Sequence, residues 1–317
     1  MKAHCMARQR GVAVVTALLL TTLAITIVAS LFWQQQVQVR SIENQRLQLQ
    51  KQWILRGALD WTRLILREDK RITPNVDHLG EPWAVPLAET RLDEYVEKGG
   101  ANTDVPDAAL SGGITDAQAR FNLTNLLQNG AVNPVEVAVL GRLLRNAGQS
   151  PALAQAVADL MVSAQRKSLQ EGSNPGSSAA QPLNILYVDD LLAVTGFTPE
   201  ILTSIRDFIV VLPRMTQINV NTAPAEVLAA RIDTLSLSDA AALVASRKNT
   251  WFRNEAEFGQ RLQAQGKQLG TGTGQIAVST NYFLVNGNVR LNRAGMQMQA
   301  LIDRSAANPK VLWIRED

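Results

Sequence analysis

The first hydrophobic pattern along the chain is an unbroken apolar run at residues 12–33, which contains no charged residue, proline or glycine. A helix of this length spans roughly 33 Å, enough to cross the hydrocarbon core of a bilayer. Trp33 ends the run, and an indole ring suits the membrane interface. The pattern predicts a transmembrane helix over residues 12–33.

The pattern then becomes amphipathic. Residues 34–69 are rich in Gln, Arg, Leu and Glu, which favour helix. Apolar residues recur there at helical spacing, namely Ile42, Leu49, Trp53, Ile54, Trp61, Leu64 and Ile65. One helix from Val12 to about Asp69 would be roughly 85 Å long. Its amphipathic half needs a surface to pack on, so we expect a sheet or further helices to follow.

The rest of the chain alternates between strand-like and helix-like patterns. Prolines and glycines divide residues 70–120 into short pieces, which predict strands within 87–96 and near 114–121. Apolar runs at helical spacing follow at 134–147, 151–169, 187–194, 198–211, 223–231 and 238–248. Strand patterns return in 276–317, with a hairpin turn expected at Asn286-Gly287 and further strands at 295–304 and 310–315.

These elements predict an α+β fold in which a long amino-terminal transmembrane and amphipathic helix packs on an antiparallel sheet. The sheet domain would comprise residues 34–121 and 276–317, and a large all-helical domain, residues 122–275, would be inserted into it. The segments FNLTN (121–125) and INVNT (218–222) each precede an apolar helix. An internal duplication of the helical domain is therefore an open alternative.

The basic charge is concentrated at the amino terminus. Three of the 31 Lys and Arg residues (Lys2, Arg8 and Arg10) lie in residues 1–11, leaving 28 basic against 28 acidic residues. This balance removes the bulk electrostatic argument for nucleic-acid binding. The single cysteine, Cys5, lies in the same segment, so a disulfide framework downstream is excluded.

Three processing schemes fit a basic segment followed by an apolar run: an uncleaved signal anchor, a signal peptide cleaved after the run, and a prepilin-type leader cleaved before it. The run is longer than a usual signal-peptide core, and no clear A-x-A site follows it. The sequence RQR-Gly11-Val12 has the form of the third scheme. We therefore expect residues 1–11 to be a leader.

This arrangement resembles the type IV pilin and pseudopilin superfamily. The resemblance implies that prepilin peptidase cuts between Gly11 and Val12, that Val12 is N-methylated, and that the helix packs into a filament. Most members carry Glu at the fifth mature position, where this chain has Thr16. A subunit at the tip has no neighbour whose amine would compensate that carboxylate, and an unpaired charge near lipid is costly.

Thr16, the long chain and the stretches 112–125 (GGITDAQARFNLTN) and 217–230 (QINVNTAPAEVLAA) resemble the minor pseudopilin K family of type II secretion. The family implies a structural subunit that caps a periplasmic pseudopilus and supports export of folded proteins across the outer membrane. The chain would cross the inner membrane once, with a cytoplasmic amino terminus and a periplasmic body. Implied partners are minor pseudopilins I and J, the major pseudopilin G filament through other minor pseudopilins, prepilin peptidase and inner-membrane lipid.

The runner-up function is a membrane-anchored periplasmic DNA-binding protein, because 218–228 and 251–262 resemble half of a helix-hairpin-helix module. The hairpin at 233–238 (DTLSLS) has no glycine, which disfavours backbone contact with phosphate. We therefore expect no nucleic-acid partner.

No enzymatic activity and no cofactor are predicted. Two catalytic alternatives stay open, a Ser-His-Asp triad that uses His78 and a catalytic pair among the acidic residues named next. Structural calcium stays open, with Asp189 and Asp190 as one acidic group and Asp93, Glu94, Asp104 and Asp107 as another, although no EF-hand spacing is present.

Overall fold

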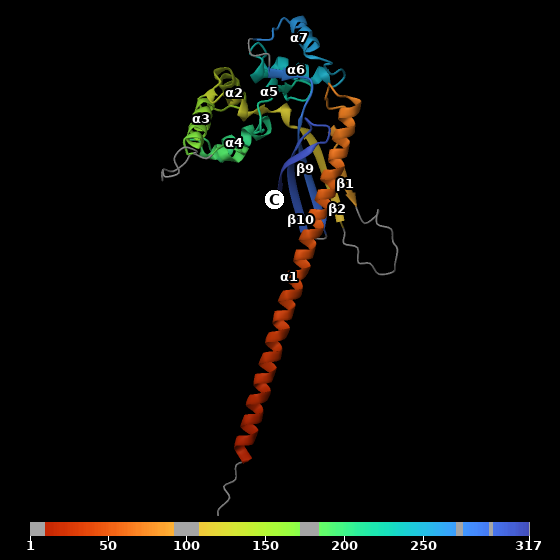
Figure 1. Cartoon of the computed structure of the whole chain (residues 1–317), viewed down its shortest axis with the longest axis vertical. Coiled ribbons are helices and arrows are strands. Elements are labelled where there is room, and N and C mark those ends of the chain that lie inside the picture. The colour runs from red at the N-terminus through yellow and green to blue at the C-terminus, as the bar shows by residue number, and fades with distance from the viewer. Residues whose placement is uncertain (1–9, 92–107, 172–183, 271–274, 292–293, 317) are drawn as a thin grey trace, which may run out of the picture. The chain divides into compact units, whose positions relative to one another are not determined.

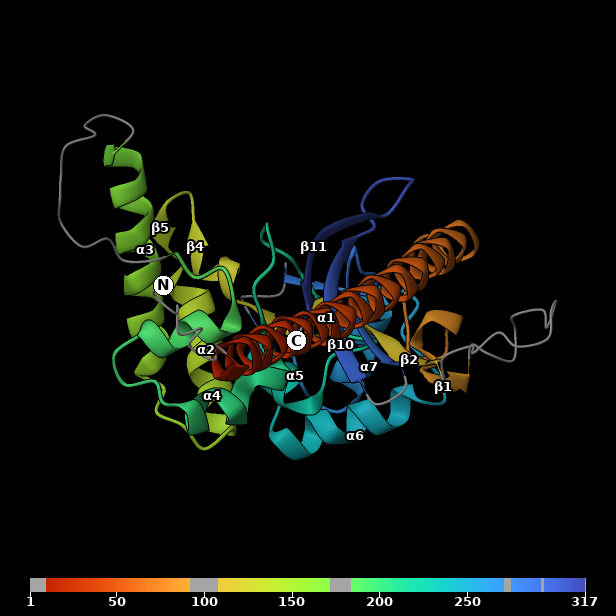
Figure 2. The same cartoon turned by 90° about the horizontal axis from the view of Figure 1, so that it is seen from below.

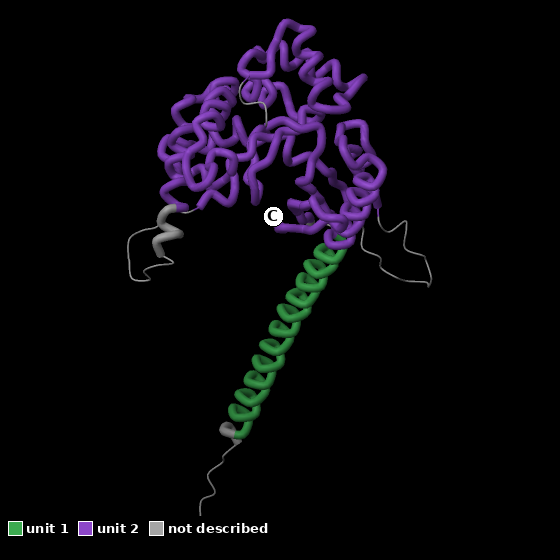
Figure 3. Tube along the Cα trace, turned by 45° about the horizontal axis from the view of Figure 1, so that its top comes forward, with its two compact units in different colours: residues 1–54 green, residues 55–317 purple. Residues whose placement is uncertain are grey.

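The computed structural model describes residues 10–91, 108–171, 184–270, 275–291 and 294–316 (Figure 1). The chain divides into two compact units, residues 1–54 and 55–317, shown in Figure 3. One helix, α1 (Arg10–Ile72), begins in the first unit and ends in the second. In the first unit, every residue from 13 to 46 is exposed.

The second unit contains a five-stranded antiparallel sheet in the order β1-β2-β9-β10-β11. Four of its strands, β1, β2, β10 and β11, are labelled in Figure 2. The strands are β1 (Leu87–Arg91), β2 (Ala108–Asp116), β9 (Tyr282–Leu291), β10 (Ala294–Asp303) and β11 (Lys310–Glu316). Because β2 pairs with β9, about 165 residues of mainly helical chain are inserted between neighbouring strands. The predicted α+β class, with a long apolar helix, an antiparallel sheet and several helices, is confirmed.

The second half of α1 provides an apolar stripe. Leu55, Leu59 and Leu66 are all buried and recur at helical spacing. A Cβ added to Gly287 on β9 would lie 3.3 Å from the Leu55 side chain, so the helix lies close against the sheet at that point. The pattern correctly indicated a helix that packs on a sheet, but the residues it named for the packed face were wrong. Five of them are exposed, namely Ile42, Leu49, Trp53, Trp61 and Leu64, and Ile54 and Ile65 are only partly buried.

The turn expected at Asn286-Gly287 is wrong. Both residues lie in the middle of β9, and Gly287 is not among the positive-φ residues that the structure describes. Gly287 pairs with Gly112 on β2, where a Cβ would lie 2.3 Å from the carbonyl oxygen of Asn286. Glycine is needed here for close approach of two strands and a helix, rather than for a turn.

The inserted region contains six α-helices among its described residues: α2 (Pro134–Asn146), α3 (Leu153–Glu171), α4 (Pro199–Ile205), α5 (Ala225–Arg231), α6 (Leu237–Arg247) and α7 (Glu255–Ala264). Short 3₁₀ helices are η1 (Pro82–Ala84), η2 (Ala117–Ala119), η3 (Leu123–Leu126), η4 (Val188–Ala193) and η5 (Arg206–Phe208). Short strands are β3 (Phe121–Asn122), β4 (Leu127–Gln128), β5 (Ala131–Val132), β6 (Ile209–Val210), β7 (Ile218–Asn219) and β8 (Ile276–Ala277).

Three sequence-based expectations for this region are wrong in detail. The segment 187–194 forms 3₁₀ turns, because the Asp190 carboxylate accepts hydrogen bonds from the backbone N–H groups of Leu186 and Tyr187 and closes a tight turn. The helix expected at 198–211 ends at Ile205 and is followed by η5 and β6. The strand expected near 114–121 ends at Asp116, which caps η2.

The inserted region has a repeated topology. Its first part begins with β3 and ends with β6, two strands that pair in parallel, and α2, α3 and α4 lie between them along the chain. Its second part begins with β7 and ends with β8, which also pair in parallel, and α5, α6 and α7 lie between them along the chain. Each first strand carries an asparagine, Asn122 or Asn219, whose side chain accepts a hydrogen bond from the backbone N–H two residues later. We call these parts the first and second repeat; their similarity favours a duplication.

A buried ion pair joins the two repeats. Arg231 on α5 donates two hydrogen bonds to Glu136 on α2, at 2.6 and 2.7 Å, and both side chains are 1% exposed. The surrounding apolar core draws on both repeats, including Leu140 and Leu144 of α2 and Leu228 of α5. The repeats therefore share one core.

Candidate functional site

The apolar part of α1 has the composition of a membrane-spanning helix. Within the described residues, the helix Ala13–Ile72 alone is long and apolar enough for a span, with a mean hydropathy of 2.4 in its most apolar window. The Thr16 hydroxyl donates to the Ala13 carbonyl oxygen at 3.0 Å. Thr21, Thr22 and Thr26 make the same kind of bond, so their hydroxyls find acceptors within the helix.

The predicted processing site lies at the beginning of α1. Gly11 and Val12 are in its first turn, whereas residues 1–9 lie outside the described residues. Thr16 is therefore on the same helix, one turn further along.

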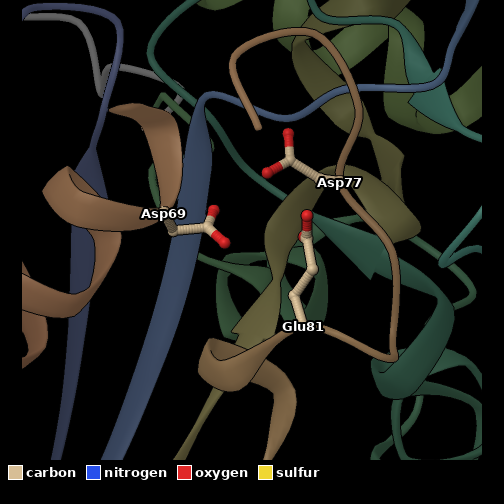
Figure 4. A group of neighbouring side chains, drawn as sticks. All are labelled: Asp69, Asp77 and Glu81. Carbon is tan, nitrogen blue, oxygen red and sulfur yellow. The ribbon is translucent and has the colours of Figure 1, made fainter. Parts of the chain in front are cut away.

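The second unit contains a cluster of three buried carboxylates that the sequence did not indicate. Asp69 lies near the end of α1, and Asp77 and Glu81 lie in the connection to β1. One carboxylate oxygen from each lies within 4.8 Å of the others, and the three groups point toward one another in Figure 4. We call these residues the carboxylate cluster.

Arg304, directly after β10, supplies the positive charge for this cluster. Its Nη1 donates to Asp69 Oδ2 at 2.6 Å, and its Nη2 donates to an Asp77 carboxylate oxygen and to the Thr280 carbonyl oxygen. Its side chain is 1% exposed, and its Cζ lies 4.5 Å from the centroid of the Phe283 ring. Arg304 therefore connects the end of the sheet to the end of α1.

The cluster holds more negative than positive charge in a buried place. Burial and the nearby Glu81 charge raise the pKa of Asp69 to about 6, although Arg304 opposes the shift. Burial also raises the pKa of Asp77, again against Arg304. Glu81 accepts hydrogen bonds from Thr73, Trp83 and the His78 backbone. Proton uptake by the aspartates would relieve the excess charge.

All-oxygen ligands suit a hard cation such as calcium. In the carboxylate cluster, however, the Arg304 guanidinium already lies against Asp69 and Asp77. Of the calcium candidates from the sequence, Asp189 pairs with Arg206 and Asp190 caps η4. Asp93, Glu94, Asp104 and Asp107 lie outside the described residues.

A further buried carboxylate, Asp116, joins the sheet to the second repeat. Its Oδ2 accepts hydrogen bonds from Thr222 at 2.6 Å, Thr280 at 2.7 Å and Asn219 at 3.0 Å. Burial raises its pKa to about 6, and these hydroxyl donors oppose the shift. The Thr280 backbone N–H also donates to Asp77 at 2.7 Å, so this network continues into the carboxylate cluster.

The hairpin between α5 and α6 does not present the groups that bind phosphate. Ser236 and Asp239 bond each other's backbone N–H groups as a capping box for α6, and Thr234 donates to the Gln268 carbonyl oxygen. Asp233 is exposed at the same turn. Two carboxylates beside the hairpin would repel a nucleic-acid backbone.

His78 has a packing role among the described residues. Its ring stacks on Trp251 with centroids 3.9 Å apart, and its Nδ1 accepts a hydrogen bond from the Gly80 N–H at 3.1 Å. Trp251 comes from the loop between α6 and α7 of the second repeat. The contact therefore joins the α1–β1 connection to that repeat.

Comparison with known proteins assigns the chain to a family. Two family models described as "Type II secretion system (T2SS), protein K" match residues 119–214 and 218–279. The protein named "Type II secretion system protein K" from Pseudomonas aeruginosa is 31% identical over 314 residues, covering 93% of this chain and 87% of that protein. The chain belongs to the type II secretion system protein K family. The two matched ranges contain the first and the second repeat, respectively.

Other relatives support this assignment. The Klebsiella pneumoniae protein of the same name is 27% identical, covering 94% of this chain and 93% of that protein. A crystal structure described as the GspK-GspI-GspJ complex from the enterotoxigenic Escherichia coli type 2 secretion system contains a chain with a TM-score of 0.66 and 20% identity. The match covers 88% of this chain and 99% of that chain, which shows the same fold.

Family membership confirms the predicted role as a minor pseudopilin in type II secretion, and no finding supports the DNA-binding alternative. The relatives are named as secretion-system components. The apolar helix fits a single-pass membrane anchor in such a protein.

Proposed function

We propose that this chain is the tip-capping subunit of a periplasmic pseudopilus and supports export of folded proteins across the outer membrane. The observation that carries the proposal is Thr16, whose hydroxyl is bonded within its own helix and which adds no charge to the apolar run. A carboxylate at this position would be stabilised by a subunit above it; a terminal subunit has none. The inserted helical region adds bulk on which a further subunit would clash.

The proposed processing follows from the same helix. Prepilin peptidase removes residues 1–11 by cleavage between Gly11 and Val12, and Val12 is then methylated. Residues 12–33 cross the inner membrane with the amino terminus in the cytoplasm, as the basic leader favours. The periplasmic body comprises a pilin domain, residues 34–121 and 276–317, and the inserted helical domain, residues 122–275.

The proposed partners are minor pseudopilins I and J. The support is the solved relative, which is described as a complex of GspK with GspI and GspJ. Other minor pseudopilins connect this tip to the major pseudopilin G filament. No catalytic step, no cofactor and no nucleic-acid partner are part of the proposed function.

The test is mass spectrometry of the amino terminus of the chain purified from membranes that contain prepilin peptidase. The expected mature chain begins with methylated Val12. A Gly11→Val variant should keep its leader, because the peptidase would meet a bulky residue before the cut. An intact leader in the unmodified chain, or cleavage near residue 30, would overturn the proposed processing.

A further inference from the structure

A polar cleft lies between the first repeat and the sheet of the second unit, and none of its lining residues belongs to the carboxylate cluster. It has a volume of about 250 Å³ and is lined by η4 and η5 on one side and by β9, β10 and β11 on the other. A hollow of about 370 Å³ adjoins it and shares five lining residues, Asp189, Arg206, Asn286, Gln299 and Arg315. We call the two together the arginine cleft.

Arg315 on β11 is held in the cleft by two aromatic rings. Its Cζ lies 3.5 Å from the centroid of the Tyr187 ring and 4.6 Å from that of Trp313. No carboxylate of the described residues forms an ion pair with it. Aromatic stacking uses the faces of a guanidinium and leaves its N–H donors at the edge free for an acceptor.

Arg120, between η2 and β3, supplies a second guanidinium to the same cleft. Burial lowers its pKa, while the charges of Asp207 and Asp116 oppose the shift from a distance. Within the described part of the chain, no carboxylate or carbonyl accepts a hydrogen bond from its side chain. By contrast, the neighbouring Arg206 pairs with Asp189.

Arg120 and Arg315 lower the stability of the fold unless a bound group accepts hydrogen bonds from their side chains. A partly desolvated charge without a partner destabilises the fold that carries it. The lining contains three arginines against two aspartates, Asp189 and Asp207, and one of those aspartates is used by Arg206. The charge and the free donors therefore fit an anionic ligand.

Four amide side chains on β9 and β10 form a row on the face of the sheet that lines the cleft. Gln299 pairs with Asn286, and Gln297 with Asn288, across β10 and β9. All four line the adjoining hollow. The Gln299 amide donates to Asn286 Oδ1 at 3.0 Å, which leaves further donors and acceptors on these amides. Such a row can bond successive peptide groups, whereas a single small anion would not reach it.

The neighbouring sheet edge points to an extended chain as the occupant. β11 is the last strand of the sheet, and no backbone hydrogen bond joins its outer edge to another described segment. An unpaired strand edge can accept an added strand, and alternate side chains of that strand then face the same side. A segment whose one end lies along the amide row can therefore pair its other end with this edge beside Arg315.

We propose that the arginine cleft binds an extended acidic polypeptide segment, with carboxylates at Arg120 and Arg315 and with its peptide groups along the amide row. This site lies wholly within residues 112–315 and does not depend on the proposed position at the pseudopilus tip. In protein export, the acidic segment belongs to another protein that contacts the second unit of this subunit.

The test is a titration of the full-length chain in detergent micelles with a fluorescent heptapeptide that alternates Thr and Glu and has blocked ends. The expected result is saturable binding that is lost when the glutamates are replaced by glutamines. Arg120→Gln and Arg315→Gln should each weaken binding about tenfold, because each removes charge-assisted hydrogen bonds. Arg315→Lys keeps the charge and should bind more weakly than the unmodified chain.

The matched control is Arg253→Gln, which removes the same charge from an exposed loop before α7. It should leave the affinity unchanged, and thermal unfolding of all variants should show that they fold. Equal binding of the glutamine peptide, unchanged affinity in both cleft variants, or absence of saturable binding would overturn the proposal. Free glutamate that binds as tightly as the peptide would also overturn it in favour of a small-anion site.

Discussion

At the scale of single residues, the chain concentrates its buried polar groups where the sheet, the end of α1 and the second repeat meet. Asp116 accepts three hydrogen bonds at Oδ2, and Arg304 bridges Asp69 and Asp77. A buried network of this kind is stabilising only while every member keeps its partner. Its charge state therefore affects the joint between the sheet and the inserted region.

The raised pKa of Asp116 predicts a pH effect on stability. Its folded pKa of about 6 is above the ordinary value of 3.8, so the folded state binds a proton that the unfolded state releases in between. This contribution is fully present below about pH 4, falls as the pH rises to about 6, and is lost above it. Asp69 contributes in the same direction.

Asp116→Asn should therefore make the fall in unfolding free energy between pH 4 and 6 shallower. At pH 7 it should also cost about 1–3 kcal/mol, because the new amide group meets three donors. Urea unfolding at several pH values measures both effects, with Asp159→Asn, an exposed carboxyl on α3, as the control. An unchanged slope in Asp116→Asn would contradict this account.

At the scale of elements, the contact between β2 and β9 depends on glycine. Gly112 and Gly287 face each other in the ladder, and the Leu55 side chain of α1 lies against Gly287. The helix can approach the sheet closely at this point because neither residue carries a side chain. Local sequence patterns do not reveal such a contact between three segments.

Adjacent glycines on β2 allow a matched test of this packing. A Cβ on Gly112 would lie 2.3 Å from the Asn286 carbonyl oxygen, whereas one on Gly113 would lie 3.7 Å from the Pro86 side chain. Gly112→Ala should lower the unfolding free energy by about 2–4 kcal/mol, and Gly113→Ala should change it by less than about 1 kcal/mol. Equal denaturation midpoints for the two variants would show that the strands can separate at little cost.

At the scale of the whole molecule, a membrane-type helix and a folded body serve one assembly role. Family membership identifies the chain as a minor pseudopilin. Its inserted region consists of two repeats with one shared core. The apolar run around Thr16 contains no charge that a neighbouring subunit would have to compensate. The proposed terminal position connects these features.

Thr16→Glu tests that position. An unpartnered carboxylate costs about 2.5–3.5 kcal/mol at the centre of a membrane helix and less near its end, where Thr16 lies. Secretion by cells that carry the variant should therefore fall, and less of it should enter pseudopili. Thr16→Ser, which keeps a hydroxyl able to bond the helix backbone, should secrete normally. Secreted protein in the medium and the amount of this subunit in sheared pseudopili are the measurements. Normal assembly of Thr16→Glu would remove the charge argument for a terminal position.

Sequence patterns alone predicted the long helix with its apolar and amphipathic halves, the α+β class and the family resemblance. These depend on periodicity, on the length of an apolar run and on contiguous motifs, all of which are local along the chain. That the second half of α1 packs on other elements was predictable, because an amphipathic helix needs a surface to cover its apolar face. Which residues form the buried stripe was not predicted, since Leu55, Leu59 and Leu66 are buried and the expected Trp53, Trp61 and Leu64 are exposed.

Long-range packing alone determines which distant residues share a site. Asp69 and Arg304 are 235 positions apart and form an ion pair. Arg120 and Arg315 line one cleft, although Arg120 precedes the inserted helices and Arg315 lies on the last strand of the sheet. The same holds for Asn286-Gly287, which has the composition of a turn and lies in a strand because α1 and β2 press against it. Such contacts arise when long-range packing outweighs local preference, so spacing in the sequence carries no trace of them.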